Sequence, residues 1–295
     1  MSSIVSDVVV RAALESTLAI AEALLLNRLG LPFAGITVFS GLAAYGVAIT
    51  LKFGPLATLP VAAIGLTIVL LFVVLAPRLP EDRCLLLSLA ALAVARSFAG
   101  ALPWLGGQLG ISTTTTILPS QEAHRFVPLA VAVFLVAIGG GLILQRALLG
   151  LGVDIARLGP SEILAPALVP MARIRTMLFF FAAALGTSAG FLLSCYSGRV
   201  DPDIFRIDGA ITILVVALAA GYAPLRLALV PLLFFAFPDL FSSLTGYQRA
   251  ALAHVREIAW GLVILVLAGR GLGAVAQEKG SSLPVAAGNG ARGGG

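Results

Sequence analysis

Long apolar stretches separated by short polar breaks dominate the pattern of this chain. Most of them approach the roughly 20 residues that an α-helix needs to cross the ~30 Å hydrocarbon core of a bilayer. The pattern predicts about nine membrane-spanning helices, within a range of eight to ten, at residues 4–26, 35–52, 56–76, 84–104, 126–145, 174–196, 209–222, 225–241 and 251–269. Because the seventh is short for a full crossing, we interpret the seventh and eighth as a tightly turned or partly re-entrant pair around Tyr222–Pro224.

Composition supports the same class. Of the 295 residues, 59% are hydrophobic and only 11% are charged, whereas a soluble domain carries about 25% charged residues. We therefore predict an all-α polytopic membrane protein whose transmembrane domain covers residues 1–271. Residues 272–295 are rich in glycine and are expected to be a disordered tail. The net charge of +5 comes mostly from basic residues at predicted helix ends, so nucleic-acid binding is not expected.

The longest polar break lies at 145–175 and has a basic character. It interrupts the apolar pattern with six charged residues, which are Arg146, Asp154, Arg157, Glu162, Arg173 and Arg175. Lysine and arginine are more frequent in the cytoplasmic loops of membrane proteins than in the external ones. Counting them over the short loops places this break and the C-terminus in the cytoplasm. With nine spans the N-terminus would then be outside.

Charged residues within the predicted spans are costly in a bilayer and need a partner or an aqueous surface. The first span carries Asp7, Arg11, Glu15 and Glu22, which fall within roughly 80° of one another on a helical wheel. This polar stripe has two interpretations. Either it faces a partner subunit or an aqueous path, or the helix lies partly in the membrane interface or has ends that snorkel. Arg96 is the other intramembrane charge, and a carboxylate of the first span such as Glu15 or Glu22 is its expected partner.

Motifs for energy coupling and catalysis are absent from the sequence. It contains no GxxxxGK[ST] phosphate loop, no HExxH and no GxSxG. Carboxylates deep in the membrane, which proton-coupled carriers use, are few outside the first span. The spacing of Gly186 and Gly190 forms a GxxxG pattern that favours close helix packing. The chain therefore has the character of a membrane path without its own energy source, and no enzymatic activity is expected.

Several segments share a family pattern, in the right order, over about residues 20–270. They are the glycine-rich stretch 35–45 (GITVFSGLAAY), Ala167-Leu168 ahead of Arg173-Ile174-Arg175, the run 178–182 (LFFFA), the run 186–190 (GTSAG), the loop 198–205 (GRVDPDIF), residues 237–240 (FPDL) and the last apolar segment at 261–271. In these segments the chain resembles the permease subunit of branched-chain amino-acid ABC importers.

The resemblance implies an alternating-access importer in the bacterial cytoplasmic (inner) membrane. Its expected partners are a second permease subunit, identical or homologous, two ATPase subunits and an extracytoplasmic substrate-binding protein. ATP and Mg would be bound by the ATPase, and no cofactor, metal or catalytic residue is expected in this chain.

The resemblance also implies roles for particular residues. A cytoplasmic coupling loop at 146–173 would dock the ATPase, and the residues expected to carry this contact are Asp154, Arg157 and Glu162. The translocation path is expected near Gly41, Tyr45 and Gly190.

Three other classes stay open at this point. The chain resembles, in composition, a stand-alone secondary transporter or channel, and it equally fits a non-transporting membrane scaffold subunit. A membrane enzyme acting on lipid-linked substrates would need an acidic set such as Asp201, Asp203 and Asp208. The substrate stays open as well, among branched-chain and other amino acids, amides or urea, and aromatic acids.

Overall fold

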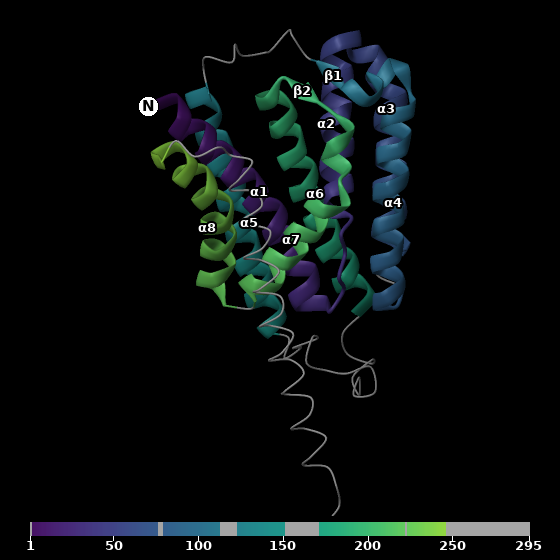
Figure 1. The fold of residues 1–295 in the computed structure, drawn as a ribbon. Helices are drawn as coiled ribbons and strands as arrows, with labels where there is room; N and C mark the ends of the chain where they lie inside the picture. The colour runs from purple at the N-terminus through teal and green to yellow at the C-terminus, as the bar shows by residue number, and fades with distance from the viewer. Residues whose placement is uncertain (1, 76–78, 113–122, 151–170, 222, 246–295) are drawn as a thin grey trace, which may run out of the picture. The chain divides into compact units, whose positions relative to one another are not determined.

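The computed structural model describes residues 2–75, 79–112, 123–150, 171–221 and 223–245, and these residues are mostly helical. The long helices, in chain order, are α1 (Ser2–Leu29), α2 (Ile36–Phe53), α3 (Pro55–Leu75), α4 (Glu81–Ala101), α5 (Ala123–Gly150), α6 (Met171–Ser197), α7 (Ile207–Ala220) and α8 (Pro224–Thr245). The short elements are the 3₁₀ turns η2 (Pro103–Leu105), η3 (Gly107–Leu109) and η5 (Pro202–Phe205) and the strands β1 (Ile111–Ser112) and β2 (Arg199–Val200). Figure 1 shows their arrangement.

Four helices in the described part of the chain are long and apolar enough to cross a membrane. They are Ile36–Phe53, Asp82–Ala101, His124–Leu144 and Ile174–Ser197. Two shorter apolar helices, Ile207–Ala220 and Leu225–Pro238, accompany them. The protein is thus an all-α membrane protein, as the sequence predicts. The count of about nine spans stays a prediction, and its last segment, 251–269, lies outside the described residues.

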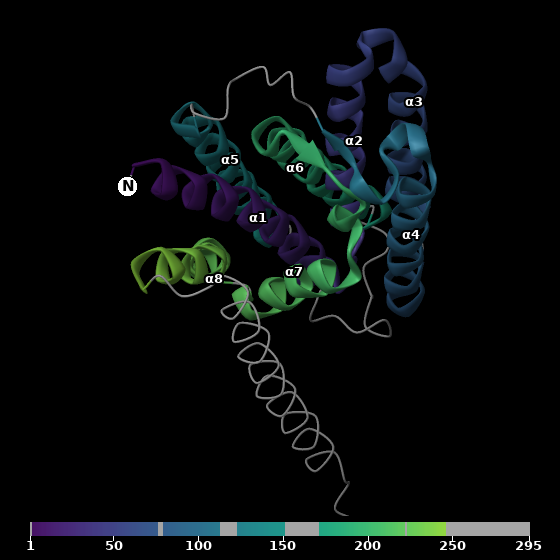
Figure 2. The same ribbon diagram turned by 45° about the horizontal axis from the view of Figure 1, so that its top comes forward.

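Helix α1 is surrounded by other helices. It packs against α5, α6, α7 and α8, and Figure 2 shows it between α5 and α8. Small residues on several of its sides make this possible, among them Ala12, Ala19 and Ala21, each at most 2% exposed. Helix α1 is therefore an inner helix of the described bundle, and the two interpretations of its polar stripe stay predictions.

An aromatic cluster joins the α1–α2 connection to two other helices. The ring of Phe33 lies 5.7 Å from Phe39, 5.5 Å from Phe72 of α3 and 5.0 Å from Phe179 of α6. Edge-to-face pairs at these separations add to the packing energy of the buried rings. The cluster holds α2, α3 and α6 together at the level where α2 begins.

Helices α7 and α8 follow each other closely, because α7 ends at Ala220 and α8 begins at Pro224; their interpretation as a tightly turned or partly re-entrant pair stays a prediction. Gly221 ends α7 with φ 61°, in the left-handed region that favours glycine. The side chain of Asn27 in α1 donates hydrogen bonds to the carbonyl oxygens of Ala217 (3.2 Å) and Gly221 (2.9 Å). These carbonyls lie at the end of α7, where intrahelical donors are lacking, so Asn27 ties the turn to the central helix.

The helices alternate in direction in a way that agrees with the charge pattern. Helices α1 and α5 end, and α4, α6 and α8 begin, at the lower end of the view in Figure 1. Arg83, Arg146, Arg175 and Arg226 all belong to those helix ends. Lys52 lies in the last turn of α2, which is at the opposite end. These four arginines therefore share one end of the described bundle, as the count of basic residues over the loops predicts.

Candidate functional site

The backbones of two long helices come close together where α6 meets α2. A Cβ placed on Gly190 would overlap the backbone carbonyl of Ser40, and one placed on Gly186 would lie 3.2 Å from the carbonyl oxygen of Ile36. Only glycine at position 190 leaves room for the backbone of the neighbouring helix. The GxxxG pattern therefore works as a helix-packing surface, as its spacing predicts.

A glycine of α2 makes room for an aromatic ring from a distant segment. The Phe205 side chain at the end of η5 occupies the space that a Cβ on Gly41 would need. Tyr45, one turn further along α2, stacks on the same ring, with centroids 5.8 Å apart and an interplanar angle of 12°. Phe205 is 2% exposed and thereby locks η5 onto α2.

The segment that carries Phe205 is held in place by polar contacts on both sides. Strand β2 pairs antiparallel with β1, with Val200 opposite Ile111. The Asp201 carboxylate accepts a hydrogen bond from the backbone N–H of Asp203 at 3.1 Å, which starts the 3₁₀ turn η5. The guanidinium of Arg199 donates to the carbonyl oxygen of Leu109. The loop is thus an ordered structure between α6 and α7.

Arg96 connects this loop to α4. Its guanidinium lies 2.9 Å from the carboxylate of Asp203. The prediction that Arg96 pairs with Glu15 or Glu22 of the first span is therefore wrong, because α4 packs against η5, which carries Asp203. Arg206 and Asp208 form a second pair at 2.7 Å. Asp203 and Asp208, two of the three aspartates considered for a membrane enzyme, thus each form an ion pair with an arginine. These ion pairs brace the loop.

Glu22 has a different environment from the rest of the charges in α1. It is 1% exposed, and one of its carboxylate oxygens accepts a hydrogen bond from the backbone N–H of Phe33 at 2.8 Å. Asp7, near the start of the helix, accepts a hydrogen bond from the Tyr196 hydroxyl and forms an ion pair with Arg11 at 3.0 Å. The polar positions of α1 thus bind its neighbours in the bundle.

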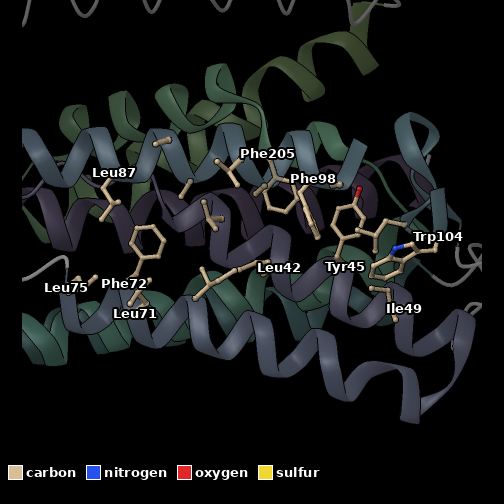
Figure 3. Close-up of a pocket in the computed structure, with 18 residues that line it drawn as sticks. Leu42, Tyr45, Ile49, Leu71, Phe72, Leu75, Leu87, Phe98, Trp104 and Phe205 are labelled. Atoms are coloured by element: carbon tan, nitrogen blue, oxygen red, sulfur yellow. The ribbon is translucent and has the colours of Figure 1, made fainter. Parts of the chain in front are cut away.

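An apolar cavity of about 550 Å³ lies beside α2, between α3 and α4 (Figure 3). Helix α2 contributes a stripe of residues one turn apart, and α4 contributes a second stripe that includes four alanines. The lining residues are Val38, Leu42, Tyr45, Ile49, Ile68, Leu71, Phe72, Leu75, Leu87, Ala90, Ala91, Val94, Ala95, Phe98, Ala99, Trp104, Leu105 and Phe205. Only Tyr45 and Trp104 among them carry a polar side-chain atom.

The ring of Tyr45 lines this cavity, whereas its hydroxyl oxygen is buried in the protein. The residue is 4% exposed, and its oxygen is buried with no hydrogen-bond partner among the described residues. A buried hydroxyl without a partner costs free energy. The lining of the cavity is therefore almost entirely apolar, and the unpaired hydroxyl lies behind it.

The residues that the sequence singles out fall into three situations. Tyr45 lines the cavity, whereas Gly41 and Gly190 lie at helix-packing contacts outside its lining. Asp154, Arg157 and Glu162 of the expected coupling loop lie outside the described residues. The role of Phe205 was not predicted, although the GRVDPDIF segment that contains it was recognised as part of the family pattern.

No family model, curated protein or solved structure matches this chain in the three comparisons with known proteins. The fold by itself places the chain in the class of helical membrane proteins. Its function has to be argued from the arrangement of its own residues.

Proposed function

We propose that this chain is a membrane-spanning permease subunit of an ATP-driven importer for branched-chain or related amino acids. Three segments that carry the family resemblance pack against one another although they lie far apart in the sequence: 35–45 in α2, 186–190 in α6, and 198–205 in the β2–η5 loop. This convergence is the observation that supports the proposal. A chance likeness of three apolar segments gives no reason for their glycines and aromatic residues to meet.

The α2–α6 contact gives the proposal a mechanical basis. The expected coupling loop 146–173 connects α5 to α6 and overlaps the last turn of α5, which ends at Gly150, and the start of α6 at Met171. Because Gly190 brings the backbones of α6 and α2 together without intervening side chains, a displacement of α6 is transmitted to α2. A motor subunit that moves the coupling loop would in this way move the helix that carries Gly41 and Tyr45.

The energy source in this proposal is a partner. Two ATPase subunits bind ATP and Mg and dock on Asp154, Arg157 and Glu162. A second permease subunit completes the path, and an extracytoplasmic binding protein delivers the substrate in a bacterial cytoplasmic membrane. The path itself passes near Gly41, Tyr45 and Gly190 in an apolar wall, since selectivity comes from the binding protein.

Co-purification tests the docking surface. We expect the tagged chain to retain an ATPase subunit, and we expect the combined change Asp154→Arg, Arg157→Glu and Glu162→Arg to reduce that retention at least tenfold. The matched control reverses two exposed charges at the start of α4, Asp82→Arg with Arg83→Glu, and should leave retention unchanged.

Two outcomes would count against the proposal in different ways. Retention of the ATPase by the triple reversal would refute the docking residues alone. Solute uptake by the purified chain in liposomes without nucleotide would refute the importer mechanism, because it would show that the chain transports without a motor.

A further inference from the structure

Glu22 is a buried carboxyl that forms no ion pair with any described residue. The side chain is 1% exposed. Its Oε1 atom accepts the hydrogen bond from the backbone N–H of Phe33 at 2.8 Å, whereas Oε2 is buried with no partner among the described residues. The thiol of Cys84, at the start of α4, is a titratable group close enough to interact electrostatically with this carboxyl. The described neighbours of the carboxyl are thus neutral groups.

The charged groups of the surrounding elements lie elsewhere. Asp7, Arg11 and Glu15 of α1 are about two turns or more nearer the start of that helix. Arg175 of α6 is partly buried and forms no ion pair with Glu22. The other helices carry charged or titratable side chains that are exposed, among them Lys52, Asp82, Arg83, Arg96, His124, Arg125, Arg146, Asp208 and Arg226.

Burial without a counter-ion decides which form of this carboxyl the structure holds. The hydrogen bond from the Phe33 N–H favours the charged form, but a buried carboxylate stays charged where several N–H groups bind it. A charge on Glu22 would leave Oε2 with neither water nor a donor. An uncompensated buried charge costs far more free energy than an unpaired neutral O–H. The enclosed arrangement is therefore that of the protonated carboxyl.

The connection between α1 and α2 forms part of the enclosure. Gly30 ends α1 with φ 66°, in the left-handed region, and its N–H donates to the carbonyl oxygen of Leu26 at 3.0 Å. This reversal of the chain brings the N–H of Phe33 back to Glu22. Residues 30–33 lie outside any helix, although Leu31 and Phe33 are at most 1% exposed. The connection is therefore the element beside the carboxyl that can move without breaking a helix.

The Phe33 ring extends the influence of this site to two other helices. It packs against Phe72 of α3, with centroids 5.5 Å apart, and against Phe179 of α6, with centroids 5.0 Å apart. The backbone and the ring of one residue thus join the carboxyl of α1 to α3 and α6. A change at Glu22 that displaces Phe33 therefore also loosens the contact of the connection with these helices.

We propose that Glu22 is a proton-binding site that keeps the α1–α2 connection closed over α1. With the proton bound, Phe33 packs over the neutral carboxyl. When the O–H bond breaks and the proton passes to water, the carboxylate is stable only where water reaches Oε2, so the connection opens. Because the closed form binds the proton more tightly than the open form, the closed form loses stability as the pH rises. The site holds whether or not the chain is a permease subunit.

Infrared difference spectroscopy of the full chain, in a detergent without carbonyl groups, tests the proton directly. At about pH 6, where an ordinary glutamate is ionised, the parent should show a C=O band of a protonated carboxyl that Glu22→Gln lacks. The band should fall roughly fivefold at about pH 9. The matched control Glu15→Gln, in the same helix, should keep the band. A spectrum at about pH 6 that Glu22→Gln leaves unchanged, or a band that persists at about pH 9, would overturn the proposal.

Backbone hydrogen exchange tests the opening. Glu22→Gln keeps an uncharged acceptor for Phe33, and comparing it with the parent at one pH cancels the intrinsic effect of pH on exchange. At about pH 9 a peptide covering residues 30–35 should exchange roughly fivefold faster in the parent, and at about pH 6 the two proteins should agree. A reference peptide covering 186–190 of α6 should exchange alike in both. Equal rates for 30–35 at about pH 9 would overturn the switch. Faster exchange of the reference peptide in the parent would overturn it as well, because the bundle would then open as a whole.

Discussion

Gly190→Ala isolates the contact between α2 and α6 in a single methyl group. The new Cβ would overlap the carbonyl group of Ser40, which belongs to helix backbone and cannot rotate away as a side chain can. Overpacking of this kind costs about 1–3 kcal/mol, whereas alanine gains up to about 1 kcal/mol over glycine in a helix interior. We therefore expect a net loss of stability of about 1–2 kcal/mol.

Two other glycine-to-alanine changes make this a graded test. A Cβ on Gly139 in α5 meets nothing within 4 Å, and one on Gly186 meets atoms of Ile36 and Phe39 at 3.2–3.4 Å. The variants are compared by thermal unfolding of the purified protein in one detergent. We expect Gly139→Ala to have the highest midpoint, Gly186→Ala an intermediate one and Gly190→Ala the lowest. If Gly190→Ala melts with Gly139→Ala, the backbone contact does not exist and the reasoning on α2 and α6 is wrong.

Two further predictions concern charged groups. Glu22→Gln should unfold within about 1 kcal/mol of the parent because its amide oxygen still accepts from Phe33, whereas Glu22→Leu should cost about 1–3 kcal/mol by leaving that buried N–H unpaired. Equal denaturation midpoints for the two variants would contradict this. Asp203→Asn should cost less than about 1 kcal/mol, since the pair with Arg96 is about half exposed on both sides. The cost should shrink in high salt when midpoints are compared at two ionic strengths, and a loss that salt does not change would contradict the ion-pair assignment.

Much of the helical framework was predictable from hydropathy alone. The segment expected at 35–52 is the helix Ile36–Phe53, and the short seventh segment expected at 209–222 is Ile207–Ala220. The segment expected at 126–145 is longer in the structure, Ala123–Gly150. Hydropathy detects where the apolar run ends. The helix itself continues into the polar flanking residues for as long as each backbone N–H finds the carbonyl oxygen four residues earlier.

The partners of the charged residues were not predictable, because they depend on tertiary contacts. Glu22 is buried through a hydrogen bond to a backbone amide eleven residues away, which exists only because the chain turns back after α1. Arg96 meets Asp203 because the loop between α6 and α7 folds onto α4. Neither arrangement leaves a periodic signal in the sequence. The GxxxG pattern, by contrast, did predict a close contact, since its geometry is local to one helix.

Phe205 links the two parts of the candidate site. Its ring fills the space above Gly41, stacks on Tyr45 and forms part of the cavity wall. A change that moves α2 relative to the loop must therefore also move the wall of the cavity. Conversely, a molecule that occupied this cavity would favour the arrangement in which Phe205 stays packed on α2, because a ligand stabilises the state to which it binds more tightly.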